Sequence, residues 1–281
     1  DYIYILQINM NKNIYYSFVV LYLSILIIPI YWIFRAAFSS QSFITAIPLN
    51  FSIEFELENF YKLYSQTPLM RYLLNSLFYS ISTALITVIA SFAAAYGFSR
   101  FEFKYRILLM WTVLVTIALP EISTLIPLYK ILQSFNLLNS VLGLCIITSS
   151  LLTPFTIWIF VPFINKIPKE IEEAGFIDGA NILNMLIKII VPISFPILSA
   201  MFLINFINTW NNLIFPLAFC ATDECKTLSV AITEIYSGRT PYGRPWDLIS
   251  ALAMIIIAPL IAIIFFTNRT IIGGLTSGSI K

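Results

Sequence analysis

Long apolar stretches separated by short charged segments dominate the hydrophobic pattern of this chain. A membrane-spanning helix needs about 20 mainly apolar residues. Six stretches reach that length, at approximately 14–34, 75–98, 107–128, 141–163, 191–215 and 248–268. The pattern therefore predicts an all-α membrane protein with six transmembrane helices. The first stretch is too long for a removable signal peptide and lacks a small-residue cleavage site, so we expect it to stay as a helix.

Composition agrees with a membrane domain. Hydrophobic residues make up 59% of 281 positions and charged residues only 11%, against about 25% charged in soluble domains. So few charges could not cover a water-soluble fold. We expect an N-terminal helix and first outer loop (1–70), a transmembrane core (71–270) and a C-terminal tail (271–281).

The density of Lys and Arg near the span ends predicts the orientation. We place the connections after the second and fourth spans in the cytoplasm, because they carry Arg100, Lys104, Arg106, Lys166, Lys169 and Lys188. Parity then puts both termini inside, in agreement with Lys12, Arg269 and Lys281, and puts segments 35–74 and 216–247 outside. The outer segments also hold Lys and Arg, so the bias lies in density rather than in total number.

Several kinds of chemistry are excluded by composition. The chain has no histidine and three cysteines, which excludes histidine-based catalysis and leaves no metal site to expect. A net charge of +2 without a basic patch argues against a nucleic-acid partner. Cys220 and Cys225 form either a small disulfide loop or two free thiols, and Cys145 is a packing residue. The sequence leaves open whether Met10 is the natural start.

The segment 167–192, between the fourth and fifth spans, is too polar to span a membrane and predicts two short helices. Pro168 suits a first helical position, glutamates follow it near the positive end of the helix dipole, and Gly179 suits a left-handed stop. An amphipathic second helix then leads to a kink at Pro192; its apolar positions are Ile182, Leu183, Leu186, Ile187 and Ile190. Such an element either docks on a partner or lies on the membrane surface.

The same segment resembles the EAA motif of binding-protein-dependent ABC importer permeases. Glu173-Ala174-Gly175, Gly179, Ile189 and Pro192 follow the spacing of that motif. Gly175 stands where the second Ala is usual, and Val191 stands where Leu is usual. The resemblance implies a cytoplasmic coupling helix that contacts an ATPase subunit. The residues it assigns to this contact are Glu172, Glu173, Ala174, Gly175, Asp178 and Gly179.

Flanking motifs resemble the maltose-type sugar permeases over roughly residues 75–281. They are Pro120, Pro127-Leu128-Tyr129, Leu137-Leu138-Asn139-Ser140, Pro154-Phe155, Trp158, Trp210-Asn211-Asn212, Pro216-Leu217 and the tail Gly274-Leu275-Thr276-Ser277-Gly278 with Lys281. This resemblance implies a sugar or oligosaccharide as cargo, although polyamine and phosphate permeases share the EAA loop. It also implies a second permease subunit, for which it favours a different sequence over a second copy of this chain. Two cytoplasmic ATPase subunits, an extracytoplasmic substrate-binding protein and a prokaryotic inner or plasma membrane location are implied as well.

The chain lacks the glycine-rich phosphate loop GxxxxGK[ST]. We therefore expect no enzyme activity and no cofactor in this chain, with ATP and Mg bound by the partner ATPase subunits. The two alternative classes of protein are a gradient-driven transporter and a membrane enzyme. A gradient-driven transporter would place coupling charges inside the membrane, and a membrane enzyme would need a catalytic cluster that the spans do not contain.

Polar residues in the spans predict where a substrate passes. Asn205, Asn208 and Asn212 share one face of the fifth helix, with Trp210 and Asn211 beside it. These side chains either bind a sugar or hydrogen-bond neighbouring helices.

Glu121 is the one acidic residue well inside a predicted span. It is expected at a depth similar to that of Asn208. The two residues either share a polar site, or Glu121 pairs with an outer charge such as Arg71.

Overall fold

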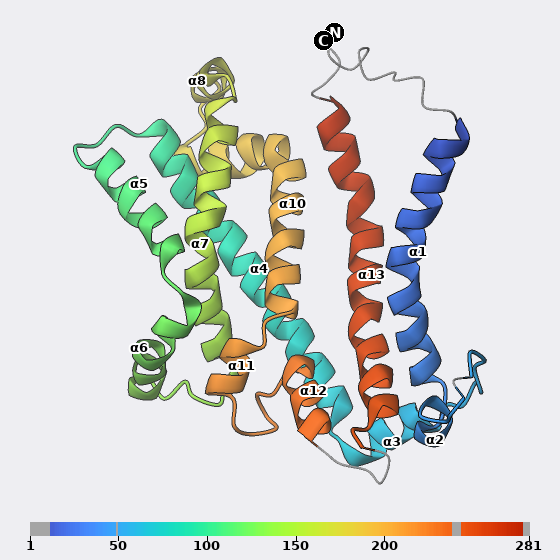
Figure 1. Ribbon diagram of the computed structural model, residues 1–281. Helices are drawn as coiled ribbons and strands as arrows, with labels where there is room; N and C mark the ends of the chain where they lie inside the picture. The colour runs from blue at the N-terminus through green and yellow to red at the C-terminus, as the bar shows by residue number, and fades with distance from the viewer. Residues whose placement is uncertain (1–11, 49, 238–242, 278–281) are drawn as a thin grey trace. The chain divides into compact units, whose positions relative to one another are not determined.

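A computed structural model describes residues 12–48, 50–237 and 243–277, with side chains placed between residues 15 and 265 of these ranges. All regular secondary structure in these ranges is helical (Figure 1). Met10, Arg239, Gly278 and Lys281 lie outside the described residues, and so do the side chains of Lys12 and Arg269. The predicted tail 271–281 is described only as helical backbone up to Ser277.

Five helical stretches are long and apolar enough to cross a membrane. They are α1 (Lys12–Ala37), α4 (Leu69–Arg100), α7 (Val141–Asn165), the stretch that ends with α10 (Val191–Trp210), and α13 (Trp246–Ser277). Five of the six predicted spans therefore correspond to these helices, with boundaries that differ by several residues. The chain is a multi-pass membrane protein.

The third predicted span, 107–128, is broken. Helix α5 (Arg106–Val115) continues as a 3₁₀ turn (Thr116–Ala118), and α6 (Glu121–Ser134) leaves at an angle of 105°. Pro120 has no N–H and disfavours helical geometry in the residue before it. Leu119 accordingly adopts an extended conformation, with φ −73° and ψ 126°. The structure thus contains six spans only if this bent pair counts as one.

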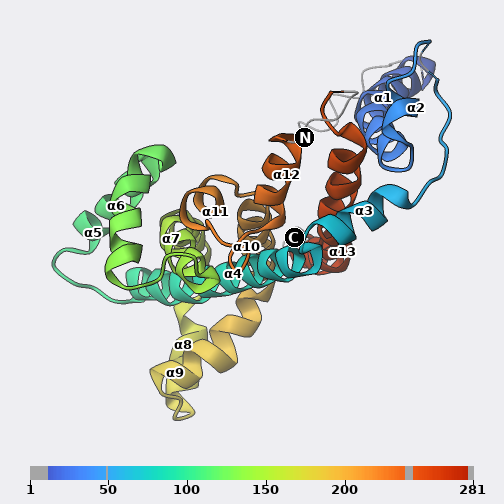
Figure 2. The same cartoon turned by 90° about the horizontal axis from the view of Figure 1, so that it is seen from below.

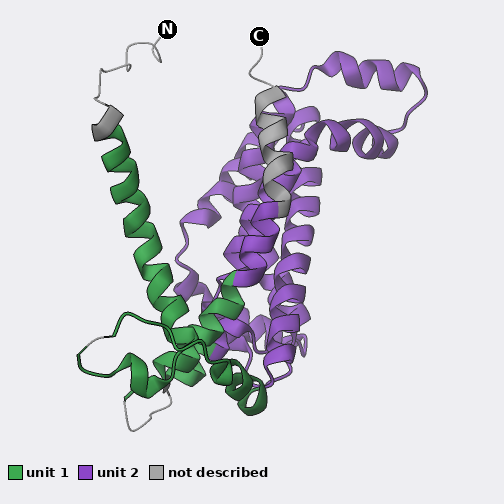
Figure 3. Ribbon diagram, turned by 90° about the vertical axis from the view of Figure 1, so that its right-hand side faces the viewer, with its two compact units in different colours: residues 1–67, 232–257 green, residues 68–231, 258–281 purple. Residues whose placement is uncertain are grey.

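The chain divides into two compact units, residues 1–67 with 232–257 and residues 68–231 with 258–281 (Figure 3). The first unit contains α1, α2 (Gln41–Ile44) and α3 (Glu58–Gln66). The most apolar stretch of α1 has no buried residue. The end of α1 is fixed to the following loop by Arg35, which is buried, donates to the Ser52 carbonyl at 3.1 Å and stacks over the Trp32 ring.

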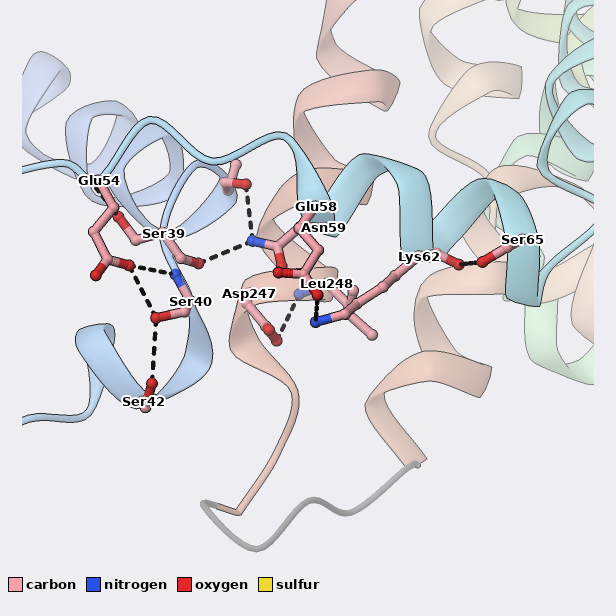
Figure 4. Close-up of polar contacts among 11 residues, drawn as sticks. Ser39, Ser40, Ser42, Glu54, Glu58, Asn59, Lys62, Ser65, Asp247 and Leu248 are labelled. Atoms are coloured by element: carbon pink, nitrogen blue, oxygen red, sulfur yellow. Dashed lines mark hydrogen bonds and ion pairs between the residues drawn. The ribbon is translucent and has the colours of Figure 1, made fainter.

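Polar side chains organise the loop after α1, as Figure 4 shows. Buried Asn59 donates to the carbonyls of Ala37 and Ser39 at 3.1 and 2.9 Å. The backbone N–H and hydroxyl of Ser40 both donate to the Glu54 carboxylate at 2.9 Å. These contacts satisfy the backbone groups that the end of a helix leaves free.

The second unit is built around α4, which packs against α7 and α10 (Figure 2). Small hydroxyl residues at helical spacing on the buried face of α4 permit this close approach; they are Ser76, Ser80, Thr83, Thr87 and Ser91. Toward the other end of α4 the packing is apolar. The rings of Phe92 and of Phe160 in α7 pack edge to face, with their centroids 5.4 Å apart. The C-terminal ends of α4 and α7 support the segment described next.

Candidate functional site

The polar segment after α7 folds as helix α8 (Lys169–Ile177), followed by a tight turn. Pro168, predicted at the first helical position, is instead the N-cap, and the helix begins one residue later at Lys169. The helix ends with Gly179 at φ +86°, where the N–H groups of Gly179 and Ala180 each donate at 3.0 Å to the carbonyls of Phe176 and Gly175. This is a Schellman ending, which satisfies the last carbonyls and favours glycine at the left-handed position.

Glu172 anchors α8 to the end of α4. Its carboxylate accepts from Arg100 Nε at 2.6 Å and from the Tyr96 hydroxyl at 2.8 Å. The Arg100 guanidinium also donates to the carbonyls of Ile164 and Ile167, at 3.0 and 2.9 Å. Both charged side chains are only 8% exposed. The ion pair therefore joins α8, α4 and the end of α7.

Gly175 allows α8 to lie close to the following helical segment. A Cβ atom at this position would be 2.6 Å from Met185 Cε and 2.9 Å from Ile189 Cδ1, and Met185 is fully buried. The position where the family motif usually has Ala is therefore tightly packed here. Glycine costs about 1 kcal/mol of helix propensity relative to Ala, and in exchange it permits this contact.

The opposite face of the segment is exposed. Of the six residues predicted to contact an ATPase, Glu173, Ala174, Asp178 and Gly179 are exposed, whereas Glu172 and Gly175 are buried. Phe176 and Ile177 join the exposed face, and Ile177 is 86% exposed. This face combines two carboxylates with two large apolar side chains, which suits a protein contact better than contact with water alone.

Helix α9 (Ile182–Met185) leads through a π-helical segment (Leu186–Ile190) directly into α10. The side chain of Asn181 caps the start by accepting from the Asn184 N–H at 2.8 Å. Where the sequence predicts a kink at Pro192, the structure places the wide π turns immediately before it. Such π segments are one way in which a helix accommodates an interrupted hydrogen-bond ladder.

A cavity of about 730 Å³ lies within the second unit, beside the break between α5 and α6. It is lined by Thr112, Val113, Thr116, Ile117, Leu119, Glu121, Thr124, Thr148, Ser150, Leu151, Leu152, Thr153, Pro154, Phe155, Ile157, Asn208, Asn212 and Phe215. The lining residues come from α5, α6, α7, α10 and α11 (Ile214–Phe219), from the 3₁₀ turn after α5, and from the connections at Leu119 and Asn212. Its size is within the range of small-molecule sites in proteins.

The cavity brings together three of the residues predicted to line a substrate path: Glu121, Asn208 and Asn212. Glu121 is the first residue of α6, at the bend rather than inside a straight span. Within the described part of the chain its carboxylate forms no ion pair, so the alternative pairing with Arg71 is absent here.

The other predicted path residues lie elsewhere. Asn205 is fully buried and donates to the Thr156 hydroxyl of α7 at 3.2 Å, which is a helix–helix contact. Trp210 is buried and stacks on Phe206 at 5.6 Å. Asn211 is exposed at the C-cap of α10. None of the three lines the cavity.

Sequence reasoning missed the aromatic rings of Phe155 and Phe215 and the hydroxyls of α5 and α7 that line the cavity. Hydroxyl residues at positions 112, 116, 148, 150 and 153 are visible in the predicted spans. Because Ser and Thr in membrane helices commonly bond their own backbone, they are a weak signal for a binding site.

Beyond the cavity, a short loop carries the two remaining cysteines. Cys220 and Cys225 are bonded to each other, with their Cα atoms 5.3 Å apart. The loop is held to α4, where the Tyr72 hydroxyl donates to Asp223 at 2.6 Å and the Asn75 amide donates to the carbonyls of Glu224 and Lys226 at 3.0 Å. The hydrogen bond from Tyr72, and then that from Lys226, lowers the pKa of Asp223 below its ordinary value.

Comparisons with known proteins agree on one family. Residues 86–274 match the family described as "Binding-protein-dependent transport system inner membrane component". The trehalose/maltose transport system permease protein MalG of Thermococcus litoralis is 31% identical over 262 residues, covering 92% of each chain. The sulfoquinovosyl glycerol transport system permease protein SmoH of Agrobacterium fabrum is 30% identical, over 90% of this chain and 88% of the relative.

A solved structure has a similar fold. It is a bacterial ABC transporter involved in the import of the acidic polysaccharide alginate. A chain of that transporter superposes with a TM-score of 0.80 at 18% identity, covering 92% of this chain and 95% of the other.

Proposed function

This chain belongs to the family of binding-protein-dependent transport system inner membrane components, and we propose that it moves a sugar or oligosaccharide in a cycle driven by ATP. It is a permease subunit of an importer, not an enzyme. The proposed assembly contains a second permease subunit of different sequence, two cytoplasmic ATPase subunits that bind ATP and Mg, and an extracytoplasmic substrate-binding protein. The proposed location is a prokaryotic inner or plasma membrane, with six spans and both termini in the cytoplasm.

A carbohydrate cargo is favoured by the names of the relatives, which include permeases for trehalose/maltose and for sulfoquinovosyl glycerol. The cavity beside the α5–α6 break supports this proposal through its chemistry. It offers amide, hydroxyl and carboxylate groups together with the rings of Phe155 and Phe215. Sugars use both kinds of contact, because they carry many hydroxyl groups and an apolar ring face.

The coupling role belongs to α8. We propose that its exposed face, with Glu173, Phe176 and Ile177, contacts an ATPase subunit, while Glu172 faces inward and holds the helix to Arg100. Movement of the ATPase pair would then displace α8 and pull on the joined ends of α4 and α7. Since α7 lines the cavity and α4 packs against α7 and α10, this displacement would switch access to the cavity between the two sides. ATP and the binding protein supply the differential affinity that such a switch requires.

Two alternatives to this proposal are a permease for a different cargo and a transporter driven by an ion gradient. A polyamine or phosphate permease would keep the same coupling face but bind a charged cargo. A gradient-driven transporter would need titrating groups in the spans, and Glu121 at the bend is the one acidic residue in the cavity wall.

The decisive observation for the proposal is the exposed carboxylate of Glu173 on a helix that is anchored from its other side. The test is the ATPase activity of the purified importer in detergent, with and without the loaded binding protein, for wild type and Glu173→Arg. Glu170→Arg, a change at an exposed residue near the start of the same helix and outside the motif, is the matched control.

We expect the binding protein to stimulate ATP hydrolysis in wild type and in Glu170→Arg, but not in Glu173→Arg. If the ATPase subunits copurify with Glu173→Arg and stimulation is unchanged, α8 does not couple the two subunits through this face. If the chain purifies without ATPase subunits and moves solute without ATP, the gradient-driven transporter is the better account.

A further inference from the structure

Five of the six hydroxyl groups that line the cavity donate a hydrogen bond to a carbonyl of their own helix or turn, and the sixth, Thr148, is hydrogen-bonded to the Tyr79 hydroxyl at 2.7 Å, where either oxygen can be the donor. Thr112 donates to the Leu108 carbonyl at 2.9 Å and Thr116 to Val113 at 2.6 Å. The same pattern recurs, at 2.7 Å in each case, for Thr124 to Glu121, Ser150 to Ile147 and Thr153 to Ser149. A hydroxyl that donates to its own helix retains only lone pairs for a ligand. These side chains therefore act as acceptors toward the cavity.

Glu121 adds a carboxyl group to this wall, and a carboxylate only accepts hydrogen bonds. The side-chain NH₂ donors among the lining residues are the amides of Asn208 and Asn212. The Asn212 carbonyl oxygen accepts from the Phe215 N–H at 3.1 Å, which leaves its NH₂ group for a ligand. No Lys or Arg belongs to the lining residues of the described cavity.

We infer that this cavity selects a saccharide that is uncharged or carries an ammonium group, and that Glu121 disfavours anionic saccharides. This inference rests on the proposed transport function of the cavity. Hydroxyl and ammonium groups bring the donors that an acceptor-rich wall requires. A sulfonate or carboxylate on a sugar brings further acceptors and a negative charge, which would be desolvated beside the Glu121 carboxylate without a compensating cation.

The charge preference of the cavity can be measured without knowing the cargo. Of the three native cysteines, Cys145 is buried and Cys220 is bonded to Cys225. A thiol reagent is therefore expected to react only with a cysteine that is introduced at an accessible position. Asn208→Cys places that thiol in the cavity wall. Ser134→Cys places it on an exposed residue of α6 that does not line the cavity. Each variant is made with Glu121 present and with Glu121→Gln, and the importer is purified with its partners in detergent.

The probes are two thiol reagents of similar size, the cationic trimethylammonium-ethyl and the anionic sulfonato-ethyl methanethiosulfonate. Their reaction rates with this chain are followed by intact mass. The cation-to-anion rate ratio at Asn208→Cys is divided by the ratio at Ser134→Cys, which removes the intrinsic difference between the reagents. We expect this quotient to be about tenfold or more with Glu121 and to fall toward unity with Glu121→Gln, because one nearby charge in a partly enclosed site acts oppositely on the two probes.

Each alternative outcome contradicts a different statement. If both reagents reach Asn208→Cys and the quotient is near unity, or is unchanged by Glu121→Gln, the charge preference is wrong while the cavity still admits solutes. If Asn208→Cys reacts with neither reagent although Ser134→Cys does, the cavity is not a solute path. The proposed transport role of the cavity then fails together with the inference.

Discussion

Replacing Glu172 by Ala should loosen α8 far more than any change at its neighbour Glu173. The Glu172 carboxylate and the Arg100 guanidinium are 2.6 Å apart, and both side chains are 8% exposed. Removing one partner of a buried ion pair typically costs about 3–5 kcal/mol, because the remaining charge is left without compensation. Taking the lower value, the population of chains with α8 detached should rise on the order of 100-fold.

Limited proteolysis measures this opening directly, because Lys166, three residues before α8, and Lys169, its first residue, are both exposed. Tryptic cleavage at these lysines should be on the order of 100-fold faster in Glu172→Ala than in wild type if cleavage follows the open population. Glu173→Ala is the matched control, since a surface substitution changes stability by about 0.5 kcal/mol or less. Equal cleavage rates in the two variants would show that the Arg100–Glu172 pair does not hold α8 in place.

Two further predictions concern the packing of α8 and the pH dependence of the disulfide loop. Gly175→Leu should destabilise α8 by about 1–3 kcal/mol, because the side chain would overlap Met185 and Ile189. Combining it with Met185→Ala should restore slow tryptic cleavage at Lys169, and an unchanged cleavage rate in Gly175→Leu alone would contradict the close packing. Since its hydrogen bonds lower the pKa of Asp223, their stabilisation is complete above the unfolded pKa of about 3.9 and is lost as pH falls through the lower folded value. Tyr72→Phe should therefore raise the pH at which hydrogen exchange in residues 220–227 increases, and an unchanged onset would contradict this role of Tyr72.

Hydropathy predicted the spans but not the break at Pro120, and the reason lies in packing. Pro154 and Pro162 sit inside α7, which remains one helix, with over half of its most apolar stretch buried. Helix α5 has no buried residue, so neighbouring helices do not hold the chain straight where Pro120 interrupts it. The sequence shows the same residue type in both places, and only the tertiary contacts distinguish them.

The candidate path residues show a second limit of sequence reasoning. Asn205 and Asn208 are three positions apart and share a face in the helical periodicity. Yet one bonds to Thr156 inside the bundle, and the other borders the cavity. The edge of a cavity falls within a helix face, and its position depends on neighbouring helices that local spacing cannot specify. By contrast, Gly179 could be predicted because its left-handed φ is a local requirement of the helix end.

The adjacent residues Glu172 and Glu173 have different environments, since Glu172 is buried and paired with Arg100 whereas Glu173 is exposed. Successive helical residues point about 100° apart, so neighbouring carboxylates cannot both face the bundle. Burying an ion pair carries a desolvation cost that often cancels its attraction, and net stability is therefore a poor reason for placing Arg100 and Glu172 there. A rigid joint is a better reason, because Arg100 binds Glu172 and two carbonyls near the end of α7 at once. A displacement applied at Glu173 would then reach α4 and α7 without being absorbed within α8.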